Sequence, residues 1–225
     1  SGGERDDSAE SLVLGPVRSR VEPDDNRRGW AERSGQFSPG YYADIGPNEV
    51  SETLATVFEH YVDEDAAILE LGCSSGRHLA HLRDHGYEDL TGIDINDESF
   101  EVMAERYPEL AETGTFHTVA LEEYLPTVPD DAFDVVYSVE TLQHVHPDDV
   151  AVFEELARVT ADLLVTAENE GNGPTRGRGE RDVSYVNDEF PLYHRNWKRV
   201  FSDLGLAQLL SESGKRDTVR VFRVV

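Results

Sequence analysis

The chain has 225 residues, and its 46 acidic and 20 basic side chains give a formal net charge of -26. At 38% hydrophobic residues it can build the core of one domain, and no stretch of about 18 apolar residues is present to cross a membrane. The single cysteine, Cys73, excludes an internal disulfide framework and a cysteine-rich zinc site. Residues 1–7 are polar and unlike a secretory signal, so we expect a cytoplasmic protein.

The acidic charge is spread along the whole chain. Lysine occurs only at Lys198 and Lys215, and every other basic residue is arginine. Abundant salt screens repulsion between carboxylates, so this composition predicts a protein from a halophilic microbe. An acidic surface also argues against binding to a nucleic-acid backbone, which requires a basic face.

The first 47 residues and the rest of the chain differ in composition. Residues 1–47 are rich in glycine, serine, proline and charged residues, which predicts a flexible arm whose aromatic end, Phe37–Tyr42, contacts the body. Residues 48–225 then predict one domain. Its first element is an amphipathic helix over residues 48–62, capped by Asn48 or Ser51.

Strands and helices alternate from residue 66 onward. The expected strands are 66–71, 90–95, 114–119, 132–138, 162–167, 206–211 and 218–225. The expected helices are 76–85, 98–107, 147–160 and 193–204, and a long loop covers residues 169–188. This alternation predicts an α/β, Rossmann-like, doubly wound sheet of seven mostly parallel strands with helices on both faces. The short turn at 212–217 makes the last two strands antiparallel.

A glycine-rich turn after the first strand is the strongest motif. Gly72 and Gly76 flank Cys73 and Ser74, and glycine lets the backbone turn sharply and approach a ligand closely. The helix that follows presents free N–H groups to an anionic group. Asp94 ends the second strand, where a carboxylate can accept hydrogen bonds from ribose hydroxyls.

Three interpretations of this turn remain open. A nicotinamide-type Gly-x-Gly-x-x-Gly fits poorly, since Ser74 and Arg77 occupy its second and third glycine positions. The segment Gly72–Gly76 matches the Gly-x-Ser-x-Gly of serine hydrolases, with Ser74 as the nucleophile. The pattern Glu-x-Gly-x-x-x-Gly, followed by an acid at the end of the second strand, resembles class I S-adenosylmethionine-dependent methyltransferases.

That resemblance extends along residues 48–225. Residues 119–126 resemble the family's third motif, with Ala120 in the usual acidic position, and residues 133–145 resemble its fourth. The resemblance implies a sheet order of 3-2-1-4-5-7-6 with strand 7 antiparallel, and S-adenosyl-L-methionine as the cofactor. The residues it implies for cofactor binding are Glu70, Gly72, Cys73, Ser74, Gly76, His78, Asp94, Ile95, Leu121, Glu122, Ser138 and Val139. The alternative within this fold is a non-catalytic relative that only binds the cofactor.

The acceptor side of the site is less defined. The resemblance favours a small-molecule acceptor, with His144, Tyr193, His194 and Glu140 as catalytic candidates. Candidates for contacting an anionic acceptor are Tyr42, Arg176, Arg178 and Arg181. We expect no metal ion, because His144 and His146 have no further ligands fixed near them.

Overall fold

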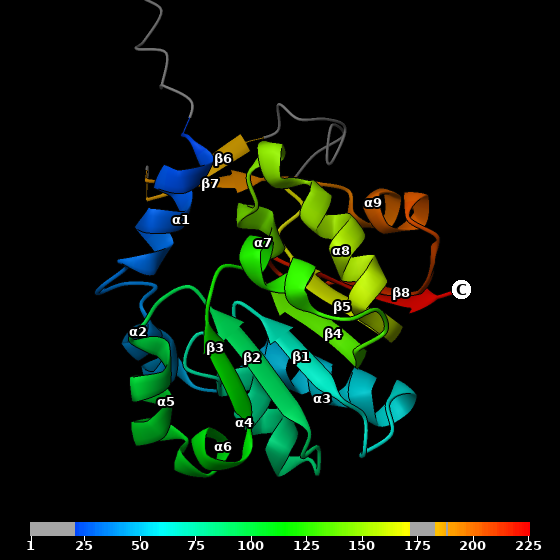
Figure 1. Cartoon of the computed structure of the whole chain (residues 1–225), viewed down its shortest axis with the longest axis horizontal. Coiled ribbons are helices and arrows are strands. Elements are labelled where there is room, and N and C mark those ends of the chain that lie inside the picture. Colours follow the sequence, from blue (N-terminus) through cyan, green and yellow to red (C-terminus); the bar gives the residue numbers. More distant parts are fainter. Residues whose placement is uncertain (1–20, 172–182, 188) are drawn as a thin grey trace, which may run out of the picture.

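A seven-stranded sheet forms the centre of the molecule (Figure 1). The computed structural model describes residues 21–171, 183–187 and 189–225. The strands of this sheet are β1 (Ile68–Leu71), β2 (Leu90–Asp94), β3 (Thr115–Thr118), β4 (Phe133–Val139), β5 (Thr160–Glu168), β8 (Leu206–Ser213) and β9 (Thr218–Val224).

The strand order is β3-β2-β1-β4-β5-β9-β8. Pairing is parallel from β3 to β5, while β9 runs antiparallel to both β5 and β8. The seventh strand of this sheet in chain order therefore lies between the fifth and the sixth. The expected fold class, strand order and antiparallel strand are confirmed.

Helices cover both faces of the sheet (Figure 1). The described helices are α1 (Pro23–Ala31), α2 (Pro39–Ile45), α3 (Glu49–Tyr61), α4 (Arg77–Asp84), α5 (Ser99–Arg106), α6 (Pro108–Thr113), α7 (Leu121–Tyr124), α8 (Ala151–Val159) and α9 (Trp197–Asp203). Three short 3-10 turns are η1 (Leu125–Thr127), η2 (Leu142–His144) and η3 (Pro147–Asp149). The helix expected over 147–160 is thus divided between η3 and α8.

Two hydrophobic cores lie on opposite faces of the sheet. Successive strand residues alternate between them: Val135 and Tyr137 belong to the core under α3 and α4, and Val136 to the core under α8 and α9. Because both faces are buried, most residues of the central strands β1 and β4 are apolar. This double burial holds the carboxyl ends of the parallel strands in fixed positions along one edge.

The segment that precedes α3 is helical where it is described. Pro39 begins α2, and the Ser38 hydroxyl caps that helix by accepting a hydrogen bond from the Tyr41 amide at 3.3 Å. The buried side chain of Asn26 fixes α1 by donating to the His144 carbonyl at 2.8 Å. This segment therefore packs against the domain through specific side chains.

The structure after β5 differs from the expected loop and helix, because it contains a second sheet of two strands. Strands β6 (Val183–Val186) and β7 (Phe190–Tyr193) form an antiparallel hairpin beside α1 (Figure 1), within and beyond the loop expected at 169–188. The helix expected to begin at Tyr193 begins instead at Trp197, because the Asn196 side chain accepts from the Arg199 amide and caps α9 there. The prediction that placed Tyr193 at a helix start was wrong.

Candidate active site

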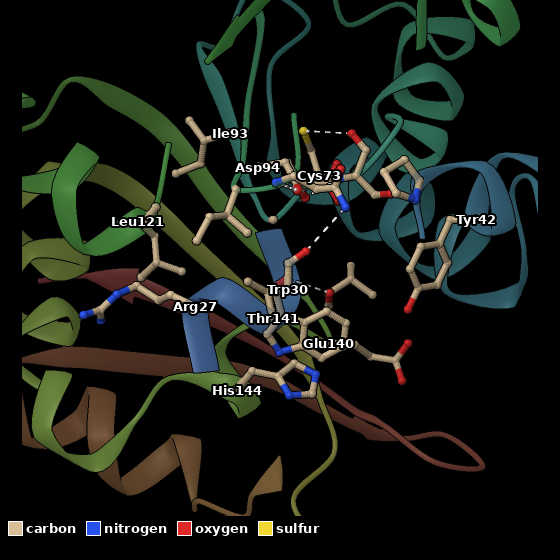
Figure 2. Close-up of a pocket in the computed structure, with 18 of the residues that line it drawn as sticks. Arg27, Trp30, Tyr42, Cys73, Ile93, Asp94, Leu121, Glu140, Thr141 and His144 are labelled. Atoms are coloured by element: carbon tan, nitrogen blue, oxygen red, sulfur yellow. Dashed lines mark hydrogen bonds between the residues drawn. The ribbon is translucent and has the colours of Figure 1, made fainter. Parts of the chain in front are cut away.

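A cavity of about 1060 Å³, partly open to solvent, lies at the carboxyl ends of β1, β2 and β4. We call it the central cavity. In Figure 2, Asp94 and Cys73 lie on one side of it, Glu140 and His144 on the other, and Leu121 and Tyr42 near its two ends. Its walls are formed by Asn26, Arg27, Trp30, Phe37, Pro39, Tyr42, Glu70, Gly72, Cys73, Ser74, Arg77, His78, Ile93, Asp94, Ile95, Asn96, Val119, Ala120, Leu121, Glu122, Val139, Glu140, Thr141, His144 and Val145. Sites of open parallel sheets occur at this edge.

The turn after β1 has left-handed backbone geometry at three positions, Gly72, Ser74 and Gly76. Gly72 has φ of 61°, and a Cβ there would lie 2.3 Å from Oγ1 of Thr141, so only glycine fits. Ser74 adopts φ of 50°, which is uncommon for a residue with a side chain. The turn therefore lies directly against the residues that follow β4.

The Asp94 carboxylate supports the strained turn. Its Oδ2 accepts from the Ser74 amide at 2.8 Å, and its Oδ1 accepts from the Asn96 amide at 2.8 Å. Burial raises the pKa of Asp94, while these amides oppose that shift. Each oxygen retains a further lone pair for a ligand hydroxyl. Asp94 can thus hold the turn and a ribose at the same time.

Glu70 places a second carboxyl group at the cavity wall. It is 1% exposed, and its Oε2 accepts from the Tyr137 hydroxyl at 2.7 Å. Burial raises the pKa of Glu70 to about 8, and the Tyr137 hydrogen bond opposes this only in part. A cationic group in the cavity would favour the ionised form.

Arg77 and His78 begin α4 beside the glycine turn. The Arg77 guanidinium lies 4.8 Å from the ring centroid of Tyr42, and no carboxylate of the described residues pairs with it within 4.0 Å. His78 is buried, its Nδ1 bonds to Ser51 Oγ at 2.8 Å, and burial lowers its pKa well below the usual value. Arg77 is therefore suited to binding a carboxylate, and His78 to holding α3.

The chain turns sharply after β4 at Glu140, which has φ of 48°. Glu168, at the end of β5, binds this turn: its carboxylate accepts from the amides of Leu142 and Gln143 at 3.2 Å each and from the Ser138 hydroxyl. Burial raises the pKa of Glu168 to about 8, opposed by these bonds. Glu168 thus fixes the segment that brings Glu140 and His144 to the cavity.

Ten of the twelve residues expected to bind the cofactor line the central cavity. Gly76 instead is the N-cap residue of α4 and packs so closely that a Cβ would lie 2.7 Å from Cε of Met103. Ser138 is fully buried against Glu168. The ten are Glu70, Gly72, Cys73, Ser74, His78, Asp94, Ile95, Leu121, Glu122 and Val139.

Two of the four catalytic candidates, Glu140 and His144, line the cavity. Tyr193 and His194 do not: Tyr193 is buried against His146, with ring centroids 5.8 Å apart, and His194 bonds to Ser184 Oγ at 2.7 Å. Tyr42 lines the cavity as expected. The arginine candidates lie outside the described residues: Arg176, Arg178 and Arg181.

Several lining residues were not among the sequence candidates. Asn96 follows Asp94 by two positions, and its side chain donates to the carbonyls of Arg33 at 3.0 Å and Trp30 at 3.4 Å. Trp30 is one of two tryptophans in the chain and stands out in an otherwise polar segment. Glu168, which does not line the cavity but fixes the turn after β4, had no sequence signal beyond its place just after an expected strand.

The hydrolase hypothesis requires a base beside Ser74. Among the described residues, no histidine hydrogen-bonds to the Ser74 hydroxyl, and the nearby His78 is bonded to Ser51 instead. The described residues therefore give the Ser74 hydroxyl no activating base. In the part of the chain that is described, no three metal-ligating side chains gather around a common point, and no helix is long and apolar enough to cross a membrane.

Comparison with known families supports the resemblance drawn from the motifs. Residues 68–162 match the family model of a methyltransferase domain. This matched region runs from β1 to the start of β5 and contains the glycine turn, Asp94 and the turn after β4. The matched region therefore supplies most of the lining of the central cavity, and α1, α2 and the β6–β7 hairpin lie outside the match.

Two fungal proteins have related sequences. An O-methyltransferase of Pyrenophora dematioidea is 26% identical over 135 residues, which are 56% of this chain and 49% of that protein. O-methyltransferase cnsE of Penicillium expansum is 26% identical over 116 residues, which are 49% of this chain and 42% of that protein. The chain spans about half the length of these curated relatives.

Solved structures share the fold. The 1,6-didemethyltoxoflavin-N1-methyltransferase of Burkholderia thailandensis, solved with bound 1,6-didemethyltoxoflavin and S-adenosylhomocysteine, has a TM-score of 0.63 at 16% identity, covering 79% of each chain. Magnesium protoporphyrin IX methyltransferase of Synechocystis, with bound SAM, has a TM-score of 0.60 at 14% identity, covering 89% of this chain and 90% of that one. At these identities the likeness establishes the fold.

Proposed function

We propose that the protein binds S-adenosyl-L-methionine in the central cavity and transfers its methyl group to a small-molecule acceptor. The observation that carries this proposal is the half-buried Asp94 carboxylate, which meets the Gly72 turn in a cavity at the carboxyl ends of β1, β2 and β4. The methyltransferase-domain match over the same residues supports it. When bound, the cofactor would supply a methyl group already activated on a sulfonium sulfur.

The residues around the cavity fit the separate parts of this cofactor. Asp94 would accept hydrogen bonds from the ribose hydroxyls, and Leu121 lies at the end of the cavity where the adenine ring would pack. Arg77, which has no carboxylate partner among the described residues, would bind the methionine carboxylate, and Glu70 the ammonium group. Binding of the cofactor would thereby explain why buried Arg77 and Glu70 and half-buried Asp94 face this cavity.

The two curated relatives are named as O-methyltransferases, which supports oxygen as the atom methylated here. An anionic acceptor bound by Arg176, Arg178 and Arg181 remains a prediction, as do the absence of nucleic-acid binding and a cytoplasmic location. We further propose that the charge of -26 is an adaptation to high salt.

Titration calorimetry with S-adenosylhomocysteine in molar KCl tests the proposal. Asp94→Asn keeps the shape of the side chain but removes its charge, so we expect a loss of about 10- to 100-fold in affinity. Asp97→Asn, at an exposed acid outside the cavity, serves as the matched control and should bind normally. A folded wild-type protein that does not bind would refute the proposal, and binding without any methyl transfer would favour the non-catalytic relative.

A further inference from the structure

A second cavity, which we call the side cavity, adjoins the central one. It has an empty volume of about 770 Å³, partly open to solvent, and shares six wall residues with the central cavity. The shared residues are Trp30, Phe37, Tyr42, Arg77, Glu140 and His144. The remaining wall consists of Tyr41, Ile45, Asn48, Gln143, Asn169, Val186, Leu192 and Arg216. A ligand in the side cavity would therefore lie directly beside one in the central cavity.

Aromatic side chains dominate one wall of the side cavity. Trp30, Phe37, Tyr41 and Tyr42 are all half-buried, and Tyr41 lies edge-on to both of its neighbours, with ring centroids 5.5 Å from Phe37 and 5.4 Å from Tyr42. Ile45, on the same wall, is 48% exposed. Apolar surface left in contact with water at a hollow is typical of a ligand site, because a planar ligand covers it and packs against the rings.

His144 presents a hydrogen-bond acceptor where the two cavities meet. Its Nδ1 lies 3.1 Å from the Pro191 carbonyl, which can only accept, so Nδ1 carries the proton and Nε2 carries a lone pair. Burial lowers the pKa of His144 to about 4, which keeps the ring neutral at neutral pH. Trp30 fixes the ring position from α1, with ring centroids 4.5 Å apart.

Glu140 is less suited to this role. Its Oε1 lies 2.5 Å from Nη2 of Arg216, so the carboxylate is already paired with a guanidinium. His144 lines both cavities and carries no charge. Among the described residues, no group hydrogen-bonds to its Nε2, so this nitrogen is free to accept a hydrogen bond from a ligand.

We infer that the side cavity holds the methyl acceptor, and that this acceptor is a planar aromatic compound whose hydroxyl group hydrogen-bonds to Nε2 of His144. This inference rests on the proposed function. The oxygen–carbon bond forms as the carbon–sulfur bond breaks, the electron pair of that bond remains on sulfur, and the hydroxyl proton passes through Nε2 of His144 to solvent. Methyl transfer removes the positive charge of the sulfonium in the same step, so that charge does not oppose protonation of the His144 ring.

Probe binding to the protein saturated with S-adenosylhomocysteine tests the aromatic wall. Catechol is the probe, and cyclohexane-1,2-diol is its non-aromatic match. We expect catechol to bind at least ten times more tightly and to quench Trp30 fluorescence, a change that Trp30→Phe abolishes. Tyr41→Leu, which alters only the side cavity, should weaken catechol binding about fivefold while leaving S-adenosylhomocysteine binding unchanged.

The role of His144 is tested with a second pair of probes. 1,2-Dimethoxybenzene has the catechol ring without a hydroxyl hydrogen, so the wild-type protein should prefer catechol by about tenfold. His144→Phe keeps a ring against Trp30 but removes Nε2, and should abolish this preference. Persistence of the preference in His144→Phe would show that another group accepts the hydrogen bond.

The results separate this inference from the proposed function. Failure of the wild-type protein to bind S-adenosylhomocysteine refutes the proposed function. Normal binding of S-adenosylhomocysteine, together with equal binding of catechol and cyclohexane-1,2-diol or no binding of either at millimolar concentration, overturns the aromatic acceptor. An unchanged catechol affinity in Tyr41→Leu would place the probe outside the side cavity and overturn the assignment as well.

Discussion

Tyr137 donates its phenolic hydrogen to Glu70 across 2.7 Å, joining β4 to β1 below the central cavity. Both side chains are fully or almost fully buried, at 0% and 1% exposure. The neutral hydroxyl satisfies one lone pair of the carboxyl group but supplies no full positive charge. Glu70 therefore ionises with difficulty until a cation enters the cavity.

This pair makes stability depend on pH. The pKa of Glu70 is raised from 4.5 to about 8 in the folded protein, so the folded state binds more protons than the unfolded state between these values. Stability therefore falls as pH rises through this window, and the loss is complete above the folded-state pKa. Glu70→Gln, whose amide oxygen still accepts from Tyr137, removes this contribution and should be more stable than the wild type at pH 8 to 9.

Thermal unfolding between pH 5 and 9 measures the effect. Glu168, whose pKa is also raised to about 8, contributes a slope of the same sign, so the variant should show a shallower slope rather than none. Parallel curves for wild type and Glu70→Gln would show that Glu70 ionises normally in the folded protein.

Removing the Glu168 side chain should destabilise the turn that carries His144. In Glu168→Ala, the buried amides of Leu142 and Gln143 lose their acceptor, and each unsatisfied group costs about 1–3 kcal/mol. Urea unfolding should therefore show a loss of several kcal/mol. Glu154→Ala, at an exposed position of α8, is the matched control and should change stability little. Similar losses in the two variants would contradict the role assigned to Glu168.

Gly92 of β2 leaves space that neighbouring side chains fill. A Cβ at this position would lie 2.7 Å from Sγ of Cys73 and 3.0 Å from Cδ1 of Leu79. Gly92→Ala should therefore destabilise the protein by about 1–3 kcal/mol through overpacking. The Sγ contact disappears in Cys73→Ala, so the double variant should lose less stability than the two single variants added together. Strict additivity in urea unfolding would show that Sγ is not the group displaced.

Salt should stabilise the protein if its acidity is an adaptation. At a net charge of -26, repulsion between carboxylates opposes the folded state at low ionic strength. The Debye length falls from about 10 Å in 0.1 M salt to about 3 Å in 1 M salt. The melting temperature should therefore rise from dilute buffer to molar KCl. Equal melting temperatures in the two conditions would contradict the proposed adaptation.

The sheet and the cofactor side of the site were predictable from the sequence because their signals are local. Buried strands form apolar runs, Asn48 caps the amphipathic α3 through its own backbone neighbours, and the Gly72 turn joins adjacent elements. These features depend on residues a few positions apart, and a resemblance to known motifs adds the strand order.

The acceptor side was less predictable because its contacts join distant parts of the chain. Asn26 binds the carbonyl of His144, 118 residues away, and nothing in the polar sequence around α1 marks that contact. Tyr193 was expected at the start of a helix, but its pairing with Val183 places it in a strand. The missed contact and the wrong helix start both concern elements whose structure is decided by tertiary packing.

The close approach of α1 to the β6–β7 hairpin has a consequence for how such a protein can diversify. A Cβ on Gly29 would lie 2.9 Å from Cε1 of Phe190, and the ring centroids of Phe190 and Trp30 are 4.3 Å apart. Neither partner is a strand of the seven-stranded sheet, so this contact can be rebuilt without disturbing the main core. Coordinated changes at positions 29, 30 and 190 would alter the Trp30 wall that both cavities share, while the residues around Asp94 remain unchanged.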